Sequence, residues 1–60
     1  MTAAHFVSYT IERFQDIATV TVARIEFTPT SHIRTVLACY ETLGRGATAS
    51  ARREVARHTS

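Results

Sequence analysis

The chain has 60 residues, of which 45% are hydrophobic and 20% charged, and its formal net charge at pH 7 is +2. This composition argues against intrinsic disorder, and a chain so short forms one domain that buries only about 60% of its unfolded surface. Its single cysteine excludes a disulfide framework, and no apolar run approaches the ~20 residues of a membrane span. The N-terminus lacks the basic and apolar regions of a signal peptide, so we expect a cytoplasmic protein.

Residues 5–27 predict an antiparallel β-hairpin. Its first half alternates apolar and polar residues, with Val7, Tyr9 and Ile11 on one face, as in a strand whose other face is solvated. The alternative is a short helix over residues 10–18. That helix would have to connect two parallel strands with fewer than ten residues, which is shorter than such crossovers allow. The hairpin is therefore favoured.

The second half of this hairpin, residues 17–27, reads IATVTVARIEF and is rich in β-branched residues. Val20 and Val22 occupy even positions, whereas Ile25 and Phe27 occupy odd positions, so apolar side chains point to both faces. A bulge near Val22 would instead place both sets on one face. Either arrangement needs partners, and pairing two hairpins into a four-stranded sheet predicts a homodimer.

Residues 30–44 predict the core helix. Thr28, Thr30 or Ser31 can cap it, Pro29 fits its first turn, and Gly44 suits the position that follows its last turn. Apolar residues recur at helical spacing and form one stripe: Ile33, Val36, Leu37, Tyr40 and Leu43. Leu37 lies in the middle of the stripe and is predicted to lie in the core.

Residues 47–58 predict a second, weaker helix or tail, because Ala47, Ala51 and Val55 form only a thin apolar stripe. The predicted fold class is thus α+β in the order ββαα, with residues 1–60 forming one small domain.

Catalytic and metal sites find little support in the sequence. His32 and Cys39 are seven residues apart, about 10 Å along a helix, which is too far to share a metal ion. Asp16 is the only aspartate, and a hydrolytic site built on it would need a rigid pocket that so few large apolar residues cannot form. With two glycines the chain also lacks a phosphate-binding loop. We expect that the protein is not an enzyme and that it binds no cofactor and no metal ion.

The basic residues gather in the last quarter of the chain. The chain up to Gly44 contains three arginines and four acidic residues, whereas the part after Gly44 contains four arginines and one glutamate. Arginine suits bidentate contacts to phosphate or carboxylate. The predicted binding residues are Arg45, Arg52, Arg53 and Arg57.

Two functions from different classes follow from this basic segment. Residues 31–43, a glycine-containing turn and residues 47–58 resemble a helix-turn-helix, and LGRGATASARREVARHTS also resembles the first two helices of winged-helix regulators. These resemblances imply a DNA-binding regulator whose arginines contact phosphates of nucleic acid. The alternative is an inhibitor or antitoxin-like module, encoded by a phage or plasmid, that docks on an acidic protein surface.

Overall fold

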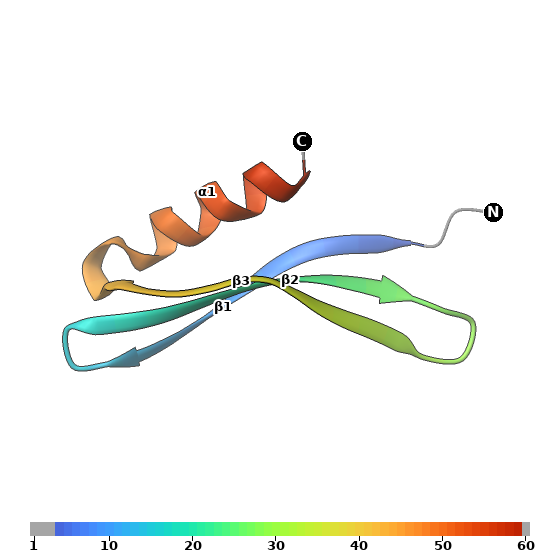
Figure 1. The fold of residues 1–60 in the computed structure, drawn as a ribbon, viewed down its shortest axis with the longest axis horizontal. Helices are drawn as coiled ribbons and strands as arrows, with labels where there is room; N and C mark the ends of the chain where they lie inside the picture. The colour runs from blue at the N-terminus through green and yellow to red at the C-terminus, as the bar shows by residue number, and fades with distance from the viewer. Residues whose placement is uncertain (1–3, 60) are drawn as a thin grey trace.

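A computed structural model describes residues 4–59 as a three-stranded antiparallel sheet with one helix on one of its faces (Figure 1). The strands β1 (His5–Phe14), β2 (Ile17–Phe27) and β3 (His32–Leu43) pair in the order β1-β2-β3. A 3₁₀ turn, η1 (Gly44–Gly46), leads from β3 into the helix α1 (Ala47–Thr59). The predicted order ββαα is therefore wrong: the chain is βββα, with a single α-helix among the described residues.

The predicted hairpin is present. β1 and β2 pair without interruption from His5 opposite Glu26 to Phe14 opposite Ile17, so the alternative helix over residues 10–18 is wrong. Two residues form the turn, and Gln15 has a φ of 56°, a conformation that usually selects glycine or asparagine. The long uninterrupted ladder outweighs the strain at this one residue.

The predicted core helix over residues 30–44 is wrong, because this segment forms β3. Val22 pairs with Ala38 while Ala23 pairs with Val36, so the residue between these two partners is an extra one in β3. Such a bulge changes the period of two into steps of three and four. Ile33, Leu37 and Tyr40 therefore share one face of a strand at the spacing that also identifies a helix.

The segment that was expected to cap that helix forms the β2–β3 turn instead. The Thr28 backbone N donates to the Ser31 carbonyl at 2.9 Å, and the Ser31 backbone N donates to the Thr28 hydroxyl oxygen at 2.9 Å. Pro29 takes the second position of this turn, where its fixed φ is favoured. Proline beside threonine and serine suits a helix start and a turn equally well, so the local sequence does not separate them.

Gly44 does not follow a helix, and neither glycine has a positive φ. Its backbone N donates to the Asp16 carbonyl at 2.8 Å, and its carbonyl accepts from the Arg13 Nη1 at 2.7 Å. These two bonds fasten the end of β3 to the β1–β2 turn. They fix the point from which α1 starts back across the sheet.

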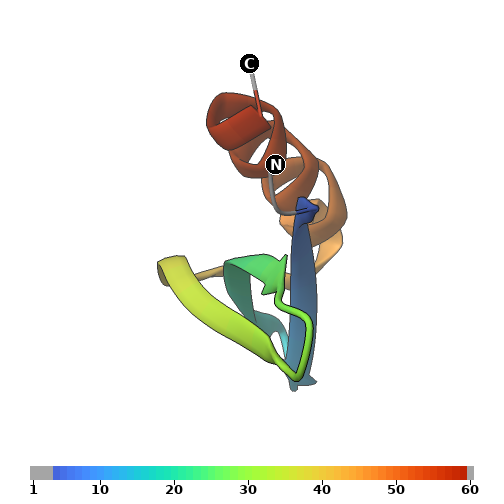
Figure 2. The same ribbon diagram turned by 90° about the vertical axis from the view of Figure 1, so that its right-hand side faces the viewer.

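The C-terminal helix is present as predicted and packs through alanine. Ala47 and Ala51 are fully buried against the sheet, and Val55 packs beside them. The Tyr40 hydroxyl of β3 and the Ser50 hydroxyl of α1 form a hydrogen bond between the two layers. α1 lies mainly over β1 and β2, at one side of the sheet (Figure 2).

The core between the layers consists of small side chains. Ala18, Val20 and Val22 of β2 are fully buried beneath α1. Among the described residues, no side chain larger than valine is fully buried. Leu37, predicted to lie in the core, packs against this cluster from the bulge but is only partly buried. We call this side of the sheet the helix face.

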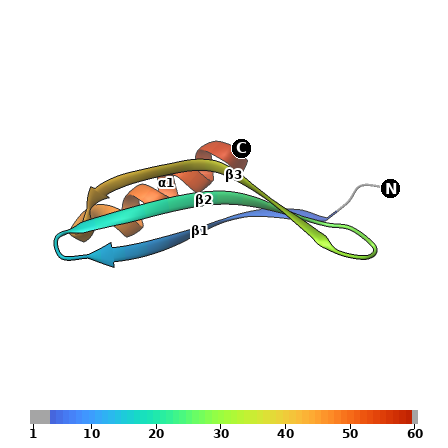
Figure 3. The same ribbon diagram turned by 60° about the horizontal axis from the view of Figure 1, so that its bottom comes forward.

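The opposite side, which we call the open face, carries the odd-numbered residues of β2 and their partners on β1 and β3. Figure 3 shows it in front of α1, which lies behind the strands. No part of the chain that the structure describes covers it. Within residues 4–59, no helix is long and apolar enough to span a membrane.

Candidate nucleic-acid interface

Three of the four predicted binding residues lie together on the outer side of α1. Arg52, Arg53 and Arg57 are exposed, and the other exposed residues on this side are small. We call this surface the arginine face; its members are Thr48, Ala49, Arg52, Arg53, Ala56 and Arg57. Small side chains between the arginines let a flat or grooved partner approach the helix closely.

The spacing of the alanines dictates where the arginines point. Ala47, Ala51 and Val55 recur every four residues and pack on the sheet, so they set one side of α1 inward. Arg53 and Arg57, also four apart, then fall on the outer side, and Arg52 lies about 100° around the axis from Arg53. The arginines are therefore held outward by a helix that the sheet fixes in place.

The single acid of α1, Glu54, lies at the flank of the arginine face rather than on it. Its carboxylate accepts from the Arg57 Nη1 at 3.0 Å, and the other carboxylate oxygen lies 3.9 Å from the His58 Nε2. Among the described residues, no ion pair involves Arg52 or Arg53. Arg57 is thus partly neutralised, and Arg52 and Arg53 carry the greater share of the positive potential.

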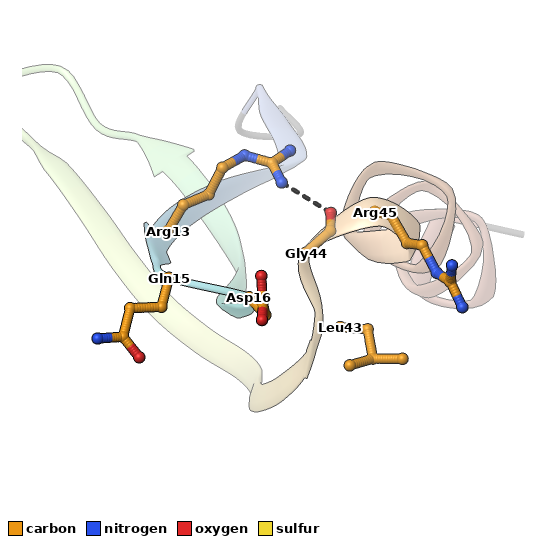
Figure 4. A pocket seen from close by; sticks show the side chains of 6 residues that line it. All are labelled: Arg13, Gln15, Asp16, Leu43, Gly44 and Arg45. Atoms are coloured by element: carbon orange, nitrogen blue, oxygen red, sulfur yellow. Dashed lines mark hydrogen bonds between the residues drawn. The ribbon is translucent and has the colours of Figure 1, made fainter.

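The fourth predicted residue, Arg45, is not part of this face. It lies in η1, before the first residue of α1, and is exposed beside a hollow between the β1–β2 turn and the end of β3. In Figure 4 its side chain points away from Arg13 and Asp16, which also line this hollow. Arg45 can extend the positive surface at one end of the helix only.

The hollow beside Arg45 is structural. Arg13 crosses it to bond the Gly44 carbonyl (Figure 4), and its six described lining residues include no serine, cysteine or histidine that could act as a nucleophile or base. The sequence reasoning missed the role of Arg13, since its partner lies 31 residues away. The pairing of β1 with β2 and of β2 with β3 brings the two residues together.

The histidines and the cysteine lie apart. Within residues 4–59, no three His, Cys, Asp or Glu side chains approach closely enough to hold a metal ion. Cys39 is an exposed free thiol on the open face, where its sulfur lies 3.7 Å from the Thr21 hydroxyl oxygen. Its segment forms β3, and the pairing with Thr21 places Cys39 on the open face.

Comparison of the chain with protein-family models, with curated proteins and with solved structures found no match. The helix-turn-helix resemblance is contradicted by the structure, because residues 32–43 form a strand instead of its first helix. The winged-helix resemblance needs two helices after residue 42, whereas the described residues there form a 3₁₀ turn and one α-helix.

Proposed function

We propose that this protein binds nucleic acid through the arginine face of α1. The observation that carries the proposal is the segregation of charge on that helix. Three arginines point outward among alanine and threonine, and the only carboxylate of the helix lies at the flank. Phosphate groups are ligands that such a set of exposed guanidinium groups fits well, through bidentate hydrogen bonds.

The fold supports contact with the backbone of nucleic acid rather than the reading of bases. The alanines at positions 49 and 56 offer no hydrogen-bonding group to a base edge, and we expect the arginines to contact mainly phosphates. A helix of 13 residues is ~20 Å long, so the three arginines can engage several consecutive phosphates. Binding would then depend strongly on salt and weakly on sequence.

Fluorescence anisotropy with a labelled DNA duplex and an RNA duplex of the same sequence tests this proposal. Three phosphate contacts per chain predict that log affinity falls against log salt with a slope of roughly −2 to −3 between about 50 and 200 mM. The variant Arg53→Gln should weaken binding and reduce the slope by roughly 1. Arg52→Gln combined with Arg53→Gln should reduce the slope by roughly 2.

The matched control is Arg24→Gln, which removes the same charge from β2, where Arg24 pairs with Glu26 at 3.2 Å. If binding depends only on net charge, Arg24→Gln and Arg53→Gln will have equal effects, and the arginine face has no special role. If the wild-type chain binds neither duplex at about 50 mM salt, the nucleic-acid proposal is wrong.

A protein-docking function is the second candidate, because both outer strands of the sheet have unpaired edges. β3 is 12 residues long and its outer edge pairs with no described segment, which is the arrangement that accepts an added strand. An inhibitor or antitoxin-like module could use this edge. Binding to a protein partner that survives Arg52→Gln with Arg53→Gln, and resists nuclease, would favour this candidate.

A further inference from the structure

The open face carries apolar side chains at its two ends and small ones in its middle. At the end near the β1–β2 turn, the pairing aligns one apolar row across the strands: Phe14, Ile17 and Leu43. Their exposed fractions are 77%, 41% and 54%, which is high for large apolar groups. In the middle of the face lie Thr10, Thr21 and Cys39, followed by Ser8, Ala23 and Val36.

The far end of the open face is aromatic and basic. The Phe6 and Phe27 rings lie 5.7 Å apart between centroids, and the Phe27 and His32 rings lie 6.5 Å apart. Arg34 stands beside them, opposite Ile25 on the neighbouring strand. This end therefore combines exposed rings with a guanidinium group.

Two carboxylates lie next to the apolar row at the turn end. Glu12 and Glu41 are the partners of Thr19 on its two sides, so the three form one transverse row. They line a hollow together with Arg13, Phe14, Gln15 and Ile17, so that two carboxylates and one guanidinium group surround it. A hollow with acidic sides and an apolar floor is suited to an arginine side chain.

The accessible area and the radius of gyration of the chain are larger than those of a compact protein of the same mass, as expected if a partner covers part of its surface. Its accessible area is 4641 Å², whereas a compact protein of 6.7 kDa exposes ~3,900 Å². Its radius of gyration is 13.1 Å, against about 10 Å for a compact chain of this length. The excess of roughly 700 Å² is close to the ~800 Å² that each partner buries in a standard interface.

We propose that a second copy of this chain covers the open face, with its strands antiparallel to those of the first copy. The two-fold axis lies between the sheets and crosses the strands at the small residues, near Thr21 and Ala23. The row Phe14, Ile17 and Leu43 of each copy then meets the aromatic end of the other. Arg34 enters the acidic hollow and faces the partner's Glu41.

The charges select this arrangement over the other way to stack the two faces. A two-fold axis parallel to the strands would place each row over itself, so Glu12 and Glu41 would meet the same two carboxylates of the partner. Like charges brought together in an interface are strongly unfavourable. The antiparallel arrangement replaces this repulsion with two symmetric Arg34–Glu41 contacts, as expected of a self-complementary surface.

A charge exchange tests the arrangement, with the dimer dissociation constant measured by sedimentation across a concentration series. Arg34→Glu and Glu41→Arg should each weaken association by roughly tenfold or more, because each change occurs twice in the dimer. The combination of both substitutions in one chain should restore association to within roughly threefold of wild type. Arg53→Glu, on the far side of the sheet, is the control and should leave association unchanged.

Cys39 supplies a second measurement that does not depend on substitution. Its thiol lies on the open face and is exposed in the single chain. Formation of the proposed dimer should slow alkylation of Cys39 by roughly tenfold or more as the protein concentration passes the dissociation constant. Circular dichroism of each variant shows that the fold is retained.

Three results would overturn the proposal. One is a chain that stays monomeric at all concentrations. Another is a dimer in which Cys39 reacts as fast as in the monomer, which would indicate pairing through strand edges. The last is a double charge variant that associates no better than the two single variants, since the two charges would then not face each other.

Discussion

The two faces of the sheet differ in how completely their apolar residues are buried. On the helix face, alanine and valine are fully buried, with Val20 and Ala51 exposing nothing to solvent. On the open face, phenylalanine, isoleucine and leucine remain exposed, and Phe14 exposes 77% of its surface. Larger side chains on the helix face, such as Ile11, Leu37 and Tyr40, pack against the core but are only partly buried.

This difference shows that the fully buried core depends on the close approach of α1 to the sheet, and not on large side chains. Small residues on both layers let α1 lie near the strands, but each contributes little transfer free energy. The large apolar residues of the open face remain exposed in the single chain. A test of this comparison must therefore change the two faces in matched ways.

The largest effect is expected from a charge placed between the layers. Ala51→Asp puts a carboxylate without a partner at a fully buried position, so it should lower the free energy of unfolding by about 3 kcal/mol or more. Ala49→Asp, on the arginine face of the same helix, should cost at most about 0.7 kcal/mol. Thermal unfolding followed by circular dichroism compares them, and equal losses would show that α1 does not pack on the sheet.

A pair of valines gives a finer comparison of the two faces. Val20→Ala removes two methyl groups from the buried face and should cost about 2 kcal/mol. Val36→Ala makes the same change where the residue is 51% exposed, and should cost under about 1 kcal/mol in dilute protein. Urea unfolding at low and high protein concentration measures both. The cost of Val36→Ala should grow with concentration, and that of Val20→Ala should not.

The smallest effect concerns the one polar link between the layers. Tyr40→Phe removes the hydroxyl that bonds Ser50 and leaves the half-buried serine without that partner. The free energy of unfolding should fall by about 1 kcal/mol. Tyr9→Phe is the control, since the Tyr9 hydroxyl makes no hydrogen bond to another described residue. Chemical denaturation should show a lower midpoint for Tyr40→Phe alone, and identical midpoints would mean that the bond adds nothing to stability.

The hairpin and the C-terminal helix could be predicted because the local sequence of each is typical of the structure that it forms. β1 alternates apolar and polar residues, β2 is rich in β-branched residues, and α1 has Ala47, Ala51 and Val55 at spacings of four. β3 could not be predicted because one bulge residue, Leu37, changed its period of two into helical spacing. The turn residues around Pro29 did not correct the error, since they suit both structures.

The candidate site divides in the same way. Arg52, Arg53 and Arg57 were predictable from helical spacing alone, as neighbours on one helix need no long-range information. The pairing of Arg34 with the acidic row was not predictable, because their positions on one face depend on the register of β3 against β2. With residues 30–44 taken as a helix, Arg34 and Glu41 lie seven residues apart on the same helix side and suggest no interface.

The placement of α1 on the side of the sheet away from the open face determines how many segments of nucleic acid a pair of chains could bind. In a pair of chains stacked through their open faces, the two helices would point in opposite directions and could not grip the same stretch of duplex. Each pair would hold two separate segments and draw them together. Such bridging is greatest near equal numbers of sites and segments, and excess nucleic acid disperses it because each pair then finds its two segments on unlinked molecules.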